Sequence, residues 1–131
     1  MPTEAEWEKA SRGTDGRIYP WGNTWEANRA NSEDAGFQKT VPVGQYPSGV
    51  SPYDALDMAG NVWEWTQSVY IPYPYNPADG REDLSNPAGK NFTLRGGAWL
   101  TLPINLRAAY RRCQTPDFHY LYVGFRLARH L

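Results

Sequence analysis

The sequence predicts an α+β fold that is rich in loops, with two short helices and a small antiparallel sheet. The 131 residues include 12 glycines and 11 prolines, which interrupt regular structure so often that long helices and strands are not expected. Six tryptophans and nine tyrosines supply large, rigid side chains that can hold loops in place. Because the periodic segments are short, we expect residues 1–131 to form a single domain with its own hydrophobic core.

Two segments carry the signals of a helix start. Thr3 and Glu6 have the spacing of a capping box, which predicts a helix that ends near Arg12. Ser51 also precedes an acidic residue by three positions, and a proline occupies the first helical position, where it is tolerated. The sequence therefore predicts a second helix over residues 51–58.

Short runs of β-branched, aromatic and aliphatic residues predict the strands. We expect them at residues 62–66, 93–95, 106–112 and 123–129. In the first of these, Trp63 and Trp65 alternate with other residues, so we expect the two indoles to face the core. Prolines in residues 69–77 keep that segment out of a central strand and predict an extended loop that carries tyrosines.

Composition and charge exclude several classes of function. The formal net charge of -1 argues against nucleic acid as a partner, because phosphate binding requires a surplus of positive charge. No apolar segment approaches the roughly 20 residues needed to cross a bilayer, so membrane insertion is not expected. A single cysteine, Cys113, excludes an internal disulfide and a cysteine-based zinc site, and it leaves the cellular location open.

Five motifs carry a family resemblance. They are PTEAEWEKA at residues 2–10, YPWGN at 19–23, DMAGNVWEWT at 57–66, RGGAW at 95–99 and GFRL at 124–127. In this order and spacing, they resemble the formylglycine-generating enzyme (sulfatase-modifying factor) family, which implies a C-type-lectin-like fold. The resemblance also implies that the usual N-terminal part of the domain is missing. A sheet without its partner strand exposes an edge, so we expect a homo-oligomer to be able to form there.

The same resemblance bears on catalysis. Enzymes of the family oxidise a sulfatase cysteine with a copper ion that two cysteine thiolates hold. The equivalent positions here are Thr101 and Leu106, and neither side chain can replace a thiolate. We therefore expect no copper and no catalytic residue. The alternative left open is an oxidase homologue or an accessory domain of a sulfatase-modifying system.

The resemblance further implies structural Ca²⁺ at two turns that are rich in oxygen ligands. The expected ligands are, at the first turn, Asp57, Gly60, Val62 and Glu64, and, at the second turn, Asn31 and Asp34. One extra residue shifts the register of the second turn before its Gly-Phe pair. The alternative is ordinary turn hydrogen bonding by these Asp and Asn side chains.

The stretch between Trp99 and Gly124 carries bulky residues where the family often has small polar ones. The candidate ligand-binding residues are Leu100, Thr101, Leu102, Ile104, Leu106, Tyr110, Phe118, His119, Tyr120, Leu121 and Tyr122. Residues 118–122 cannot all point inward, because alternate side chains of an extended segment face opposite ways. Exposed rings of this kind are typical of a binding surface, since they lose little conformational entropy on binding.

Such a surface on this fold resembles the variable proteins of diversity-generating retroelements, which randomise asparagine codons ahead of a terminal Gly-Phe-Arg. The resemblance implies a non-catalytic ligand-binding protein whose partner is a protein or a cell-surface molecule. In the alternative interpretation, the aromatic residues are buried against the tyrosines of residues 70–75, and the chain is an ordinary non-catalytic member of the family.

Overall fold

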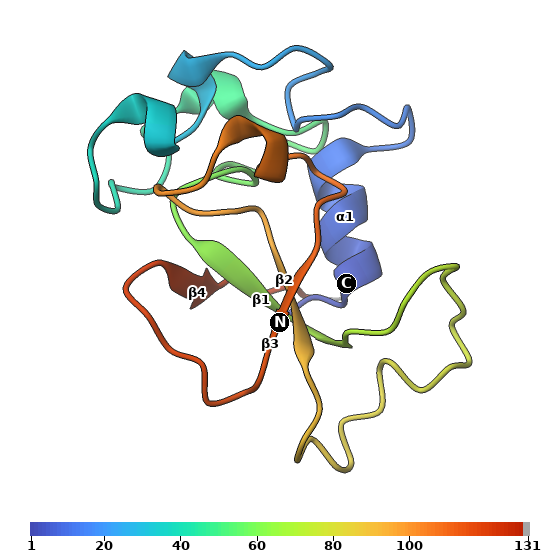
Figure 1. The fold of residues 1–131 in the computed structure, drawn as a ribbon. Coiled ribbons are helices and arrows are strands. Elements are labelled where there is room, and N and C mark those ends of the chain that lie inside the picture. The colour runs from blue at the N-terminus through green and yellow to red at the C-terminus, as the bar shows by residue number, and fades with distance from the viewer. Residues whose placement is uncertain (130–131) are drawn as a thin grey trace.

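A single α-helix stands beside a small sheet in the computed structural model, which describes residues 1–129 (Figure 1). The elements are α1 (Glu4–Arg12), β1 (Trp63–Val69), β2 (Phe92–Arg95), β3 (Arg112–Gln114) and β4 (Val123–Phe125), in the sheet order β3-β2-β1-β4. Loops with short 3-10 turns at Ala27–Arg29, Glu33–Ala35, Pro47–Gly49 and Pro103–Asn105 make up much of the rest. The predicted α+β class and the small sheet are confirmed. No helix in the described part is long and apolar enough to span a membrane.

The first predicted helix is confirmed, together with its capping box. Thr3 Oγ1 accepts a hydrogen bond from the Glu6 backbone N–H at 3.2 Å, and the Glu6 carboxylate accepts one from the Thr3 N–H at 2.8 Å. At the other end, Gly13 has a φ of 67° and donates its N–H to the carbonyl of Lys9. α1 therefore begins and ends where its terminal backbone groups find partners.

The second predicted helix, over residues 51–58, is wrong, because the segment forms turns. The hydroxyl of Ser51 accepts from the Ala55 N–H at 3.2 Å, which closes a turn rather than capping a helix. Asp54 and Asp57 have φ values of 59° and 54°, in the left-handed region that an α-helix cannot include.

The sheet differs from the prediction at the end of the chain. β4 pairs with β1 in parallel, whereas β1–β2 and β2–β3 are antiparallel. Of the strand predicted at 106–112, only Arg112 lies in a strand, because β3 spans Arg112–Gln114. The guanidinium of Arg95 accounts for this, because it donates to the carbonyls of Ala108, Ala109 and Tyr110 at 2.8 to 3.2 Å. These acceptors are then not free for a strand ladder.

Both sides of β1 are covered. On one side, Trp63 packs with Leu94 and Ala98, as the alternation predicts, while Trp65 is half-buried at the edge of the same cluster. On the other side, Glu64 and Thr66 are buried although they are polar. The strand therefore separates an apolar layer from a layer of buried hydrogen bonds and ion pairs.

Candidate functional site

Buried ion pairs make up the scaffold under the candidate site. The Glu64 carboxylate accepts from the indole N–H of Trp7 at 2.6 Å and from two nitrogens of Arg126, each at 2.6 Å. Glu4, which is 1% exposed, accepts from Arg111 at 2.6 and 2.7 Å. These bonds join α1, β1 and the segments around β3 and β4. Charge-assisted bonds shielded from water hold such a scaffold in one arrangement.

The tyrosines of the 70–75 loop belong to this scaffold. The Arg111 guanidinium lies 4.4 Å from the ring centre of Tyr70 and 4.3 Å from that of Tyr73. The described ring contacts of Phe118, Tyr120 and Tyr122 are with one another or with Arg112, so these residues are not buried against the loop tyrosines.

Three rings pack together ahead of β4: Tyr120 is exposed, whereas Phe118 and Tyr122 are half-buried against the cluster of Trp63, Leu94 and Ala98. The centroids of Phe118 and Tyr120 lie 4.5 Å apart, and those of Tyr120 and Tyr122 lie 5.4 Å apart with nearly parallel planes. Tyr120 is 57% exposed and Leu121 is 91% exposed. Hydrogen bonding from Thr115 holds the pKa of the adjacent Asp117 below its ordinary value, so that carboxylate stays ionised beside the rings.

The stack continues into a shallow cavity. The Arg112 guanidinium lies 5.7 Å from the Phe118 ring and 5.5 Å from the Trp63 ring, and Trp63 lies 5.9 Å from Tyr110. Next to them is a cavity of about 310 Å³, lined by Trp63, Leu100, Thr101, Leu102, Asn105, Tyr110 and Arg112. We call the ring stack and this cavity together the aromatic face.

Three residues of the aromatic face are not among the predicted binding residues: Trp63, Asn105 and Arg112. A usable signal existed for Arg112. Neighbouring side chains of an extended segment point to opposite sides. Since Arg111 points toward the buried ion pairs, Arg112 is expected to point toward the opposite side, where the aromatic face lies.

The other candidate residues divide between surface and core. Leu100, Leu102 and Ile104 are exposed, and so is His119. The expectation that Leu106 belongs to the exposed surface is wrong. Its side chain is 0% exposed and packs with Tyr19, Ala30 and Ala59. Its burial is fixed by close packing, because a Cβ added at Gly97 would overlap the Leu106 side chain.

The prediction that Thr101 is an exposed binding residue is also corrected, since Thr101 is 7% exposed and belongs mainly to the scaffold. Its hydroxyl accepts from the Ala98 N–H at 2.9 Å, which fixes the turn after β2. With Leu106 in the core, the two positions that the resemblance matches to copper ligands present a bonded hydroxyl and a packed isobutyl side chain. Neither group fits a copper ion.

The two expected calcium turns differ in how their oxygens are used. At the first turn, Arg126 bonds both oxygens of Glu64 and also donates to the carbonyl of Asp57 at 3.2 Å. The Asp57 carboxylate accepts from the Gly44 N–H at 2.7 Å. A guanidinium thus already supplies positive charge among these oxygens, and a calcium ion would have to displace it.

At the second turn, an oxygen is left without a partner. Asn31 Oδ1 is buried and has no hydrogen-bond donor among the described residues. Asp34 is exposed, and its carboxylate accepts from the Trp25 indole N–H at 2.9 Å. The oxygen atoms of this turn are therefore better suited to bind a hard cation than the oxygen atoms of the first turn. Within residues 1–129, no three or more His, Cys, Asp or Glu side chains gather where they could hold a metal.

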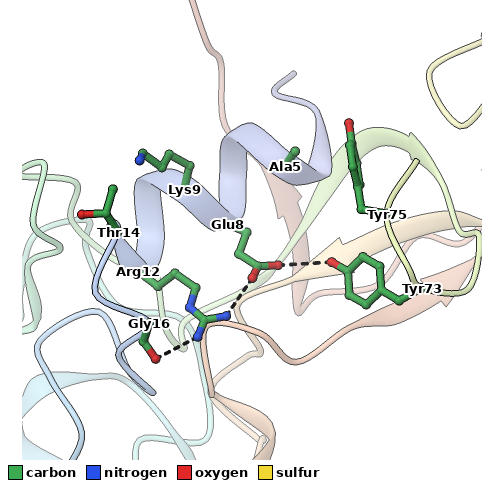
Figure 2. A pocket seen from close by; sticks show the side chains of 9 residues that line it. Ala5, Glu8, Lys9, Arg12, Thr14, Gly16, Tyr73 and Tyr75 are labelled. Atoms are coloured by element: carbon green, nitrogen blue, oxygen red, sulfur yellow. Dashed lines mark hydrogen bonds and ion pairs between the residues drawn. The ribbon is translucent and has the colours of Figure 1, made fainter. Parts of the chain in front are cut away.

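A larger cavity, of about 470 Å³, lies along α1, and Figure 2 shows its lining. Its central carboxylate, that of Glu8, accepts from Arg12 at 2.9 Å and from the Tyr73 hydroxyl at 3.3 Å, and it pairs with Arg95 at 2.5 Å. Lys9 extends away from this group. Because the central carboxylate is already shared among three donors, this cavity offers a ligand little that is unpaired.

Comparison with known proteins places the chain among relatives with several functions. The model of the sulfatase-modifying factor enzyme 1-like domain matches residues 1–131. Hercynine oxygenase of Mycolicibacterium smegmatis is 36% identical over 98% of this chain and 32% of the relative. The mouse protein named inactive C-alpha-formylglycine-generating enzyme 2 is also 36% identical, over 98% of this chain and 42% of the relative.

Among solved structures, Treponema denticola variable protein 1 superposes with a TM-score of 0.75 and 29% identity, covering 95% of this chain and 45% of that chain. The chain thus spans less than half of the length of each of these three proteins.

Proposed function

This chain belongs to the sulfatase-modifying factor enzyme 1-like domain family, and on that premise we propose that it is a non-catalytic ligand-binding domain. The aromatic face is its binding surface, and the partner is a protein or a cell-surface molecule. The observation that carries the proposal is the exposed ring of Tyr120, which packs with the half-buried rings of Phe118 and Tyr122 on a scaffold of buried ion pairs. Rigid rings supply contact area at low entropic cost.

A selection experiment tests the binding function. A phage library of random peptides is selected on the immobilised domain, and the recovered peptides are measured against Tyr120→Ala. Tyr53→Ala is the matched control, because Tyr53 is an equally exposed tyrosine that lies near Lys9 of α1. We expect most peptides to lose affinity for the first variant only. Peptides that respond to neither variant would contradict the proposal.

We further propose that the face is diversified by a retroelement. The likeness to Treponema denticola variable protein 1 supports this, as does the bulky stretch that precedes Gly124. The test is genomic: a reverse transcriptase gene near this one, with a template repeat that differs from its last segment only at adenines. A locus without either element would contradict diversification by a retroelement, and the chain would then be a binding domain of fixed sequence.

The second candidate function is that of an oxidase homologue or an accessory domain in a sulfatase-modifying system. The identity of 36% to a hercynine oxygenase favours it, and the chain spans only 32% of that enzyme. Incubation with Cu(I) and a cysteine-containing sulfatase peptide tests it. Stoichiometric copper uptake with aldehyde formation would favour the oxidase. Neither is expected with Thr101 and Leu106 at the two ligand positions.

We also propose a structural Ca²⁺ at the Asn31–Asp34 turn. The unpartnered Asn31 Oδ1 supports this choice over the Asp57–Glu64 turn, where Arg126 bonds the carboxylate. CaCl2 should raise the melting temperature more than MgCl2 does, and Asp34→Ala should remove the difference. An equal response to both salts would contradict a calcium site.

A further inference from the structure

Among the described residues that line the cavity of the aromatic face, Arg112 is the only charged one. Its guanidinium contacts the rings of Trp63 and Phe118, yet among the described residues its side chain has no ion pair and no hydrogen bond. This sets it apart from most arginines of the chain. Those with an acidic partner are Arg12, Arg17, Arg29, Arg81, Arg95, Arg111 and Arg126.

The surroundings of Arg112 prepare it to bind an anion. Two aromatic rings attract the guanidinium through their π faces at these distances without using its N–H groups as hydrogen-bond donors. Leu100 and Leu102 line the same cavity, so a bound group is partly shielded from water, which strengthens its attraction to the guanidinium. Trp63 is 3% exposed, and its indole N–H has no acceptor among the described residues. Because that N–H is covered, the charged donor that the cavity offers to a ligand is the guanidinium of Arg112.

Resting on the proposed binding function, we propose that this cavity receives a carboxylate of the partner, which pairs with Arg112. A planar carboxylate matches the forked donors of a guanidinium in a bidentate pair. The carboxylate comes from an acidic side chain or from the C-terminus of a chain, and apolar groups next to it contact Leu100 and Leu102. The nearby indole N–H of Trp63 is covered from solvent, so it reports on binding rather than making the first contact.

The test uses sodium acetate as the probe and acetamide as its neutral counterpart, at constant ionic strength. The indole N–H resonances of the ¹⁵N-labelled protein are followed by NMR, and Trp63→Phe assigns the reporter. We expect acetate to shift the Trp63 signal saturably and acetamide to leave it unchanged. Arg112→Gln should abolish the shift, whereas Arg129→Gln, which removes an exposed arginine, should retain it. Arg112→Lys should bind more weakly, because it keeps the charge but loses the fork.

Two capped peptides distinguish the sources of the carboxylate. N-acetyl-Ala-Glu-Ala-amide offers only a side-chain carboxylate, and N-acetyl-Ala-Ala-Ala with a free C-terminus offers only a terminal one. The peptide that shifts Trp63 at the lower concentration identifies the source.

An acetate shift that survives Arg112→Gln, or an equal shift with acetamide, would overturn the carboxylate proposal. If selected peptides still depend on Tyr120 while acetate fails, only the carboxylate site is wrong. If both fail, the proposed binding function is wrong as well.

Discussion

The α1 side of the molecule and the aromatic face both combine arginines with tyrosines, but they use them differently. Along α1, Glu8 bonds Arg12 and Tyr73 (Figure 2). It also pairs with Arg95. On the aromatic face, Arg112 has ring contacts but no acidic partner within residues 1–129. Where every charge is paired within the chain, the contacts stabilise the fold. Where donors are left over, they are available to another molecule.

The largest expected effect is on the paired side. Glu4→Gln removes a buried carboxylate, which leaves Arg111 without its acidic partner and Arg95 with Glu8 as its remaining one among the described residues. We expect the free energy of unfolding to fall by about 3 to 5 kcal/mol, measured by urea denaturation. Glu33→Gln, at an exposed acid, is the control and should change it by less than about 0.5 kcal/mol. Equal losses would show that the pairing does not stabilise the fold.

The next effect separates two leucines of the same stretch. Leu106→Ala should cost about 2 to 5 kcal/mol, because it leaves a cavity in the cluster formed with Tyr19 and Ala59. Leu102→Ala should cost less than about 0.5 kcal/mol, because that side chain is exposed. Thermal or urea unfolding of the two variants measures both. A similar cost for the two would place them in one environment and contradict the assignment of Leu106 to the scaffold.

A third prediction concerns binding by the face itself. Tyr110→Ala, Tyr120→Ala and Tyr122→Ala should each weaken the selected peptides by about 1 to 3 kcal/mol if the rings are central to the interface. Tyr120→Ala should change stability least, because that ring is more than half exposed. Isothermal titration measures the loss of binding free energy, and urea unfolding of the same samples measures the loss of stability. Stability losses as large as the binding losses would identify the rings as core residues.

The smallest effect concerns the protonation of Tyr73, which contacts Glu8 on the α1 side of the molecule. Burial raises the pKa of Tyr73, and the negative charges of Glu8 and Glu4 add to the rise. The pKa of Tyr73 is higher in the folded than in the unfolded protein, where it is about 10. The neutral Tyr73 hydroxyl therefore contributes fully to the free energy of unfolding below a pH of about 10, and this contribution is lost as the pH rises through the folded pKa. The difference between the ultraviolet titrations of the wild type and Tyr73→Phe should have a midpoint above 10. A midpoint at or below 10 would contradict this environment.

Local signals in the sequence predicted part of the fold correctly. The capping box located α1 because Thr3 and Glu6 satisfy each other's backbone groups without any distant residue. β2 was located by its composition, and an exposed surface at 118–122 followed from the geometry of an extended chain. These predictions needed only neighbours in the sequence.

The errors arose where distant residues decide the outcome. Most of the strand expected at 106–112 does not form, because the side chain of Arg95, 13 to 15 positions earlier, binds the carbonyls of residues 108–110. The parallel pairing of β4 with β1 depends on the path of the whole chain. Leu106 and Leu102 look alike in sequence, and only the packing against Tyr19 distinguishes them. No periodic pattern encodes such contacts.

The alternation of β1 has a consequence for how this chain can change over generations. Trp63 lies toward the cavity lined by Tyr110, whereas Glu64, its neighbour, bonds Trp7 and Arg126 on the opposite side. Mutations around the cavity therefore need not disturb the bonds behind the strand. A lineage could exchange the surface many times while inheriting the same scaffold, so the two sides of one strand can evolve at separate rates.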